Sequence, residues 1–339
     1  MQKKTVSFMF GLIVLMFIFI MLICVLFLFA TYGRRLPVFG RAVVAVVKVE
    51  GAFMDTSQEI SLLRKYTESS FVGAIVLRIE TPGGAVGCAQ EFHREILKAR
   101  RDGHKPIIAS MGNVAASGGY YISCAADEIY ANPGTVTGSI GVLLETFDFQ
   151  DVGKKIGITV NTVKSGKFKD TGSYFREMTA EEKQLLQETI DDTHNQFLEA
   201  VMEGRRVELA RAYLRRLAAG TTATLAADRS TSPSDSAAVD QAQAERVPRL
   251  VVRDYLRSFA DGRVLSGHQA WELGLVDHLG NFQDAVARAA ALAGIRGKPR
   301  ILQEKRRTSL WDLLENRTNV VSHLATRFGF ALEYRLSLD

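Results

Sequence analysis

Short apolar runs alternate with amphipathic stretches along most of the chain. Strands are predicted where Val- and Ile-rich runs are bounded by glycine, proline or charge. Helices are predicted where apolar residues recur at helical spacing. The strand ranges are 42–49, 72–79, 106–111, 128–131, 139–144 and 158–163, and the helical ranges are 86–101, 117–126, 179–204 and 282–292. Strands that alternate with helices favour an α/β fold.

The third helical range has clear signals at both ends. Thr179 and Glu182 have the spacing of a capping box, and Gly204 is the predicted stop. Residues 218–245, which follow, are rich in Ala, Thr, Ser and Asp and have almost no bulky apolar side chains. Such a composition buries too little surface to offset the entropy of ordering, so a surface insertion is predicted. Residues 296–339 form a tail of mixed composition.

The N-terminus predicts a membrane anchor. Residues 8–30 carry no charge, and as a helix they would be about 35 Å long, enough to cross a hydrocarbon core of about 30 Å. A secretory signal has a shorter apolar run and a small-residue cleavage site, so an uncleaved anchor is favoured. A short basic segment, 1–7, precedes the anchor, and a linker, 31–41, separates it from a domain expected at 42–295. Basic residues flank both ends, so charge does not predict the orientation.

Composition argues against several classes of function. The net charge is +5, without a basic stripe interleaved with aromatic residues, so no nucleic-acid partner is predicted. The three cysteines and six histidines lack the spacing of metal ligands, and there is no Walker A pattern. The sequence therefore predicts neither a metal nor another cofactor.

Ser117 is the candidate nucleophile. It lies between small residues and directly before Gly118 and Gly119, at a predicted strand-to-helix turn. A serine nucleophile needs an open approach and backbone N–H groups that stabilise the developing oxyanion. The N–H of Gly118 is one candidate donor, and that of Gly84, in the turn Thr81–Gly84, is the second. The structural alternative is a small residue and flexible glycines that serve only packing and turns.

A base for this serine is harder to find. His93 and His104 are nearest in sequence, but we expect both to face solvent among charged residues. Neither a G-x-S-x-G nor an S-x-x-K pattern is present. Lys164, Lys167 and Lys169 remain, and a lysine acts as a base when desolvation disfavours its charged form. Lys167 and Lys169 would point to opposite faces of an extended segment, and the residues alone do not decide between the lysines.

Five motifs together resemble the signal peptide peptidase A family, the S49 type of membrane-anchored serine protease. The motifs are Thr81-Pro82-Gly83-Gly84, Ser117-Gly118-Gly119-Tyr120-Tyr121, Thr137-Gly138-Ser139-Ile140-Gly141-Val142, Asp261-Gly262-Arg263-Val264 and Leu273-Gly274-Leu275-Val276-Asp277. The resemblance covers about 42–295 apart from the insertion. Each motif occurs once, as in single-copy members, and the interval from Gly204 to Asp261 is longer than is usual in the family.

The resemblance implies a fold and a mechanism. The fold would be a Clp/crotonase-like spiral of strand-strand-helix units, with one N-terminal transmembrane helix. Ser117 would be the nucleophile, Lys169 the general base, and Gly84 and Gly118 the oxyanion donors. The dyad would form between neighbouring subunits of a bowl-shaped homo-oligomeric ring. The substrates would be cleaved signal peptides or other short apolar peptides, and the domain would be extracytoplasmic.

Two alternatives remain open. A crotonase-like enzyme would use similar glycine-rich turns on acyl-CoA thioesters, and acyl-CoA binding would distinguish it. A catalytically inactive membrane scaffold would assemble a ring and bind peptides without cleaving them. Labelling of Ser117 by a serine-reactive probe would separate that scaffold from a protease.

Overall fold

The structure is a computed structural model that describes residues 15–23, 42–225, 241–304 and 333–335. It contains two compact units, Met1–Arg41 and Ala42–Asp339. In the first unit, residues 15–23 form a helix with exposed apolar side chains, and the rest of the expected anchor at 8–30 lies outside the described residues. Within the ranges described, no helix combines the length and apolar character needed to span a bilayer.

The second unit is built on an eight-stranded mixed sheet. Its path is β7-β6-β4-β2-β1-β9, and β5 pairs with both β4 and β8. The strands are β1 (Val43–Glu50), β2 (Val72–Thr81), β4 (Ile107–Ala116), β5 (Glu128–Ala131), β6 (Val136–Gly138), β7 (Val264–Ser266), β8 (His278–Leu279) and β9 (Ile301–Gln303). All pairs are parallel except β6 with β7. A separate antiparallel pair joins β3 (Gly83–Ala85) to β10 (Glu333–Arg335).

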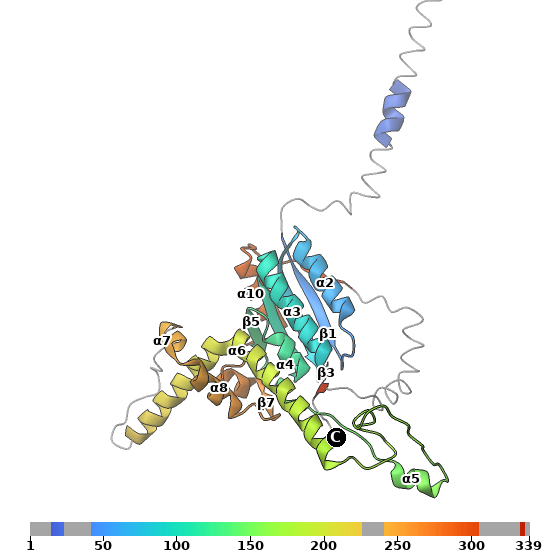
Figure 1. The fold of residues 1–339 in the computed structure, drawn as a ribbon. Helices are drawn as coiled ribbons and strands as arrows, with labels where there is room; N and C mark the ends of the chain where they lie inside the picture. The colour runs from blue at the N-terminus through green and yellow to red at the C-terminus, as the bar shows by residue number, and fades with distance from the viewer. Residues whose placement is uncertain (1–14, 24–41, 226–240, 305–332, 336–339) are drawn as a thin grey trace, which may run out of the picture. The chain divides into compact units, whose positions relative to one another are not determined.

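Helices cover both faces of this sheet, so the predicted α/β class is confirmed. The helices of the second unit are α2 (Ser57–Glu68), α3 (Val86–Gly103), α4 (Gly118–Ser123), α5 (Gln150–Lys155), α6 (Ala180–Leu225), α7 (Gln241–Arg246), α8 (Arg249–Arg257), α9 (Gly267–Glu272) and α10 (Phe282–Leu292). In Figure 1, α2, α3 and α4 lie in front of the sheet and α10 lies behind it.

Alternation along the strands separates two apolar clusters. In β1, Ala45 and Val47 join the larger cluster with α2, α3, α4 and α6, whereas Val44 and Val46 join the smaller cluster with α10. Successive side chains of a strand point to opposite faces, so a strand covered on both faces is apolar throughout. This explains why the central strands were recognisable as continuous Val- and Ile-rich runs.

Two strand predictions are wrong. Residues 158–163 form no strand, and the apolar residues among them are exposed, Val163 fully so. The strand predicted at 139–144 is replaced by β6, which ends at Gly138. A strand needs a neighbour to pair with, and composition alone does not supply one.

Gly204 does not end the third predicted helix, because α6 continues to Leu225. A Cβ at Gly204 would lie 1.9 Å from the carbonyl oxygen of Cys124, which follows α4. The glycine therefore permits close packing of α6 against α4. Residues 218–225 of the predicted insertion continue α6, and residues 226–240 lie outside the described ranges.

The expectation that His93 faces solvent is also wrong. Its side chain is buried under α4, with its ring 5.0 Å from that of Tyr121. Burial, with a smaller contribution from the charge of Arg100, lowers the pKa of His93 to about 4. Its Nε2 atom has no hydrogen-bond partner within the described ranges. The imidazole is therefore a neutral member of the core.

This burial predicts an acid-sensitive fold. The unfolded chain binds a proton at His93 below about pH 6.5, whereas the folded chain does so only near pH 4. Stability is thus lost as the pH falls through this window, by up to about 3 kcal/mol. His93→Phe should flatten the pH dependence of the urea midpoint between pH 6.5 and 4. His104→Asn, at an exposed helix end, should leave it unchanged; equal slopes for wild type and His93→Phe would contradict the assignment.

Candidate active site

Ser117 joins the end of β4 to the start of α4 with a strained backbone. Its φ is 53° and its ψ is −115°, a combination that residues other than glycine rarely adopt. Its N–H donates to the carbonyl of Gly138 over 2.8 Å, and its own carbonyl accepts from the N–H of Tyr121 over 2.8 Å. The strain is therefore maintained by bonds on both sides of the residue.

Glycines bring a second turn directly against this serine. A Cβ on Gly118 would lie 3.2 Å from the amide nitrogen of Gly84 and 3.3 Å from Cα of Gly83. A Cβ on Gly119 would lie 2.8 Å from Cγ2 of Thr81. Since β2 and β4 are parallel neighbours, their carboxyl ends lie at the same edge of the sheet. The structure thus brings the predicted residues Ser117, Gly118 and Gly84 together.

Phe53 fixes the orientation of the glycine turn, and the sequence analysis did not identify it. Its N–H donates to the carbonyl of Gly83, and its carbonyl accepts from the N–H of Ala85. A Cβ on Gly84 would lie 1.9 Å from that carbonyl oxygen. Because hydrogen-bonding directions alternate along a strand, the N–H of Gly84 faces away from Phe53. No motif surrounds Phe53, so no sequence signal pointed to it.

The edge of β3 away from Phe53 accepts an extended strand. There β10 pairs antiparallel, with Tyr334 opposite Gly84 and Arg335 opposite Gly83. The segment beside the candidate oxyanion donor can therefore form a backbone ladder with another strand.

Two further motifs support Ser117 from the other side. β6, which supplies the Gly138 carbonyl, pairs with β7, and the N–H of Ser139 donates to the carbonyl of Arg263 over 2.8 Å. The N–H of Gly262 donates to the carbonyl of Ile140 over 3.1 Å. These residues, far apart in the chain, form one backbone support.

The segment 275–277 holds both α4 and α6. The Tyr120 hydroxyl donates to the carbonyl of Leu275 over 2.9 Å. Close by, the guanidinium of Arg205 in α6 donates to Asp277 over 2.7 Å, and the N–H of Ile129 donates to the same carboxylate. The Arg205 side chain is 1% exposed, so this pair ties α6 to β5 inside the protein.

No base contacts Ser117 within the described residues. Its side chain is buried, and Oγ has no hydrogen-bond partner. The buried His93 lies against Tyr121, in the layer beneath α4. A histidine base bonded to the serine is thus absent from the described part of the chain.

The three candidate lysines differ in their partners. The amine of Lys164 donates to Asp170 over 2.5 Å, and Lys167 forms an ion pair with Glu181. Lys169 is exposed, and among the described residues its amine has neither a hydrogen-bond nor an ion-pair partner. A general base must be free to lose its proton, so the geometry favours Lys169 over the other two lysines.

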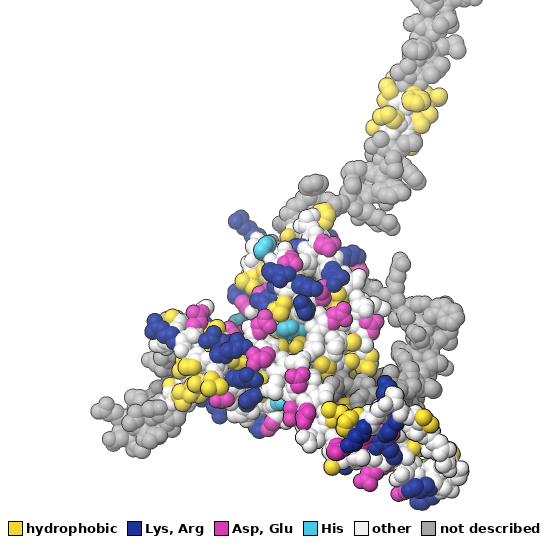
Figure 2. Space-filling view, in the orientation of Figure 1, with side chains coloured by type: hydrophobic (Ala, Val, Ile, Leu, Met, Phe, Trp, Pro, Cys, Tyr) yellow, Lys and Arg dark blue, Asp and Glu magenta, His cyan; other side chains and the backbone are white. Residues whose placement is uncertain are grey.

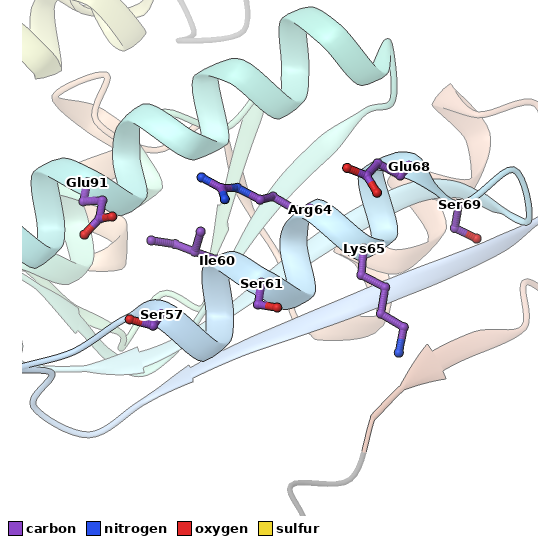
Figure 3. Close-up of a pocket in the computed structure, with 8 residues that line it drawn as sticks. All are labelled: Ser57, Ile60, Ser61, Arg64, Lys65, Glu68, Ser69 and Glu91. Atoms are coloured by element: carbon purple, nitrogen blue, oxygen red, sulfur yellow. The ribbon is translucent and has the colours of Figure 1, made fainter.

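A surface depression of about 670 Å³ lies elsewhere, along α2 (Figure 3). It is lined by side chains of α2, among them Ser61, Arg64 and Lys65, and by Glu91 of α3. None of the residues predicted for the active site lines it. Its mixed charges and the missing nucleophile make it a poor candidate for the catalytic centre.

A serine with a strained backbone at a strand-to-helix turn, packed against a glycine-rich turn, is an arrangement typical of serine hydrolases. A family model described as peptidase family S49 matches residues 99–230 and 248–296. The chain belongs to this family, the signal peptide peptidase A family, and is a serine peptidase.

Two relatives agree in sequence with the family match. A Synechocystis protein described as a protease is 34% identical over 256 residues, which are 75% of this chain and 76% of that protein. The chloroplastic serine protease SPPA of Arabidopsis thaliana is 30% identical over 268 residues, 78% of this chain and 33% of the relative. A solved structure of the membrane-bound stomatin-specific protease 1510-N with a substrate peptide has a TM-score of 0.41 and 13% identity, and covers 83% of this chain and all of that one.

The strain at Ser117 has a measurable consequence. Ser117→Gly should be about 1 kcal/mol more stable than Ser117→Ala, because glycine relieves strain of about 1–3 kcal/mol and loses up to about 1 kcal/mol of unfolded-state entropy. Urea unfolding of the two variants measures the difference. An alanine variant as stable as the glycine variant would show that the backbone here is relaxed.

Proposed function

We propose that the chain is a membrane-anchored endopeptidase in which Ser117 and Lys169 form the catalytic dyad. The N–H groups of Gly84 and Gly118 stabilise the oxyanion, and the substrates are cleaved signal peptides or other short apolar peptides. The observation that supports this most directly is the strained backbone of Ser117, beside a glycine turn that approaches it closely. The Oγ atom of Ser117 has no hydrogen-bond partner in the part of the chain that the structure describes.

The chemistry follows from these groups. Lys169 without its proton takes the proton of the Ser117 hydroxyl while Oγ attacks the peptide carbonyl. The two glycine N–H groups stabilise the negative charge on the carbonyl oxygen. Lys169 then donates the proton to the leaving amine, and water repeats the sequence on the acyl-enzyme. The residues themselves supply each proton transfer.

We propose that a second copy of the chain completes the dyad. Among the described residues, buried Ser117 has no base and exposed Lys169 has no partner, which fits a lysine that acts in a neighbouring subunit. The segment around Lys169 exposes several apolar side chains, and Figure 2 shows hydrophobic atoms scattered among Lys and Arg in this part of the surface. Its exposed apolar side chains include Phe147, Val152, Ile156, Ile158, Val160, Val163 and Phe168. Contact with another subunit would bury this surface and desolvate the amine.

The proposal also includes a Clp/crotonase-like fold and a membrane anchor. The succession β2, β3, α3 has the strand-strand-helix order of a Clp/crotonase-like spiral. Residues 8–30 would form a single-pass anchor that keeps the domain, outside the cytoplasm, close to peptides released in the bilayer.

Mixing two inactive variants tests the dyad. Ser117→Ala and Lys169→Ala should each lower peptide hydrolysis by about 10³-fold or more, because each removes a group that acts in the reaction. Co-assembly in equal amounts should return activity at about a quarter of the sites, since an intact serine then meets a neighbour's intact lysine.

The matched control is Lys98→Ala, which removes a paired amine of α3 outside the loop that carries Lys169, and it should keep activity. A fluorophosphonate probe should label Ser117 in the wild type. Peptide binding without labelling or cleavage would indicate the scaffold alternative. A mixture as inactive as its components would place the dyad within one subunit.

The β3 edge yields a second test. A substrate strand that pairs beside Gly84 needs the edge now occupied by β10. A chain that ends at residue 332 should therefore have a lower KM for short apolar peptides and a similar kcat. An unchanged KM would mean that the substrate backbone binds elsewhere.

A further inference from the structure

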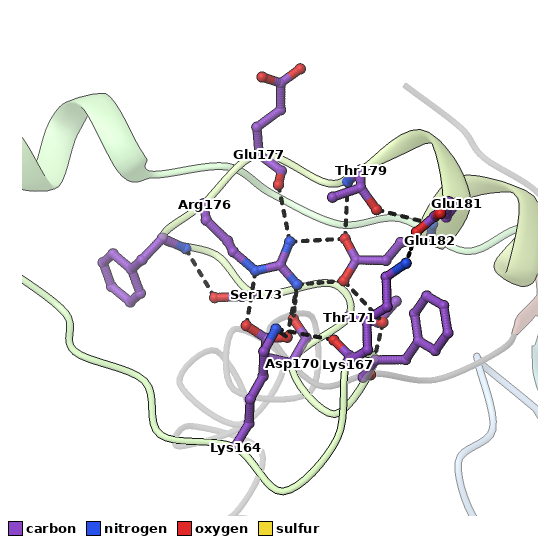
Figure 4. Close-up of polar contacts among 12 residues, drawn as sticks. Lys164, Lys167, Asp170, Thr171, Ser173, Arg176, Glu177, Thr179, Glu181 and Glu182 are labelled. Carbon is purple, nitrogen blue, oxygen red and sulfur yellow. Dashed lines mark hydrogen bonds and ion pairs between the residues drawn. The ribbon is translucent and has the colours of Figure 1, made fainter.

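Arg176 is the centre of a polar network that includes Asp170, the residue that follows the candidate base Lys169 (Figure 4). Its Nε and one terminal nitrogen donate to the two carboxylate oxygens of Asp170, both over 2.9 Å. The other terminal nitrogen donates to Glu182 over 2.8 Å and to the carbonyl of Glu177 over 3.1 Å. The guanidinium thus joins the residue after Lys169 to the first turn of α6.

The acceptor on α6 is itself firmly held. The side chain of Glu182 is 3% exposed, and it accepts from the N–H of Thr179 over 2.9 Å, which confirms the predicted capping box. The bonds from Arg176, followed by that from Thr179, lower the pKa of Glu182 to about 2. Arg176 and then Lys164 also hold the pKa of Asp170 well below its usual range. Both carboxylates are therefore charged at neutral pH.

These bonds fix the backbone on both sides of Lys169. The carbonyl of Phe168 accepts from the Thr171 hydroxyl over 2.8 Å, and the N–H of Lys169 donates to the carbonyl of Gly166 over 3.2 Å. Arg176 additionally donates to the carbonyl of Asp170 over 3.0 Å. In a segment with little regular structure, the amine of Lys169 thus extends from a well-supported turn.

Charge in the network is balanced. The charged groups joined to this turn, from the loop and from α6, are Lys164, Lys167, Asp170, Arg176, Glu181 and Glu182. They comprise three cations and three anions. Without Arg176, one uncompensated negative charge would remain beside Lys169 and favour the protonated amine, which cannot act as a base.

We propose that Arg176 is a positioning residue for Lys169: it orders the turn that presents the amine and cancels the charge of the carboxylates beside it. The inference rests on the proposed function, in which Lys169 is the base. Lysine could not replace Arg176, because an ammonium group has three donors and lacks the planar fork that bridges two carboxylates.

Four variants separate the two contributions. Arg176→Lys keeps the charge but loses the fork, so kcat for peptide cleavage should fall about 10–100-fold through misplacement of the base, with KM within about twofold. The acidic limb of its pH–rate profile should stay in place. Arg176→Gln should lower kcat similarly and move this limb to higher pH by about half a unit.

Asp170→Asn should move the limb in the opposite direction. The double variant Asp170→Asn/Arg176→Gln restores neutrality, so its limb should return to the wild-type position while kcat stays low. A merely structural role would change the melting temperature and leave the limb in place.

The matched control is Arg288→Gln. Arg288 of α10 donates two hydrogen bonds to the carboxylate of Glu128, away from the candidate site. Its loss should change neither kcat nor the acidic limb of the pH–rate profile. If Arg176→Gln fails to fold, the Arg176→Lys and Asp170→Asn variants still decide the outcome.

The rate of Ser117 acylation by an uncharged peptide ester, measured in the assembled protein, gives both readouts. If Lys169→Ala is inactive while Arg176→Gln keeps the wild-type kcat and limb, the role of Arg176 is refuted alone. If Lys169→Ala remains active, the proposed function fails first.

Discussion

The candidate site depends on the close approach of two backbone turns at the carboxyl ends of β2 and β4. Thr81–Gly84 and Ser117–Gly119 contact each other at positions where a Cβ would clash. Three sets of hydrogen bonds stabilise this arrangement and hold Ser117 in its strained conformation. They join Ser117 to Gly138 in β6, close the first turn of α4, and join Phe53 to the glycine turn. A strained backbone conformation persists only where several independent interactions of the surrounding structure enforce it.

The same constraint explains the distribution of the sequence motifs. Gly138 and Arg263 contribute backbone atoms, so their side chains reveal little about their role. Asp277 and Arg205 contribute a buried ion pair, which fixes α6 against β5. Each motif is thus a support for the strand-to-helix turn, although only one of them contains the nucleophile.

Sequence patterns succeeded where a residue's environment was set by its own neighbours. Central strands, buried on both faces, were visible as apolar runs, and the Thr179–Glu182 capping box identified the start of α6. They failed where a distant partner decided the outcome. Gly204 lies inside α6, where its missing side chain leaves room for the carbonyl of Cys124. His93 is buried against α4, and residues 158–163 pair with no strand in the described part of the chain. Ser117, Gly118 and Gly84 were predicted to act together, and the structure brings them together, whereas their catalytic roles remain proposals.

The two residues of the proposed dyad are held in place by different interactions. Ser117 lies in the packed core, where its hydroxyl is buried and, among the described residues, has no hydrogen-bond partner. Lys169 lies in a segment with almost no core, where ion pairs around Arg176 replace apolar packing as the source of order. A single exposed ion pair contributes little to stability, but a guanidinium that bonds two charged carboxylates at once can order a loop that buries little apolar surface. In the proposed mechanism the base comes from a neighbouring subunit, so assembly of the subunits would determine when the peptidase becomes active.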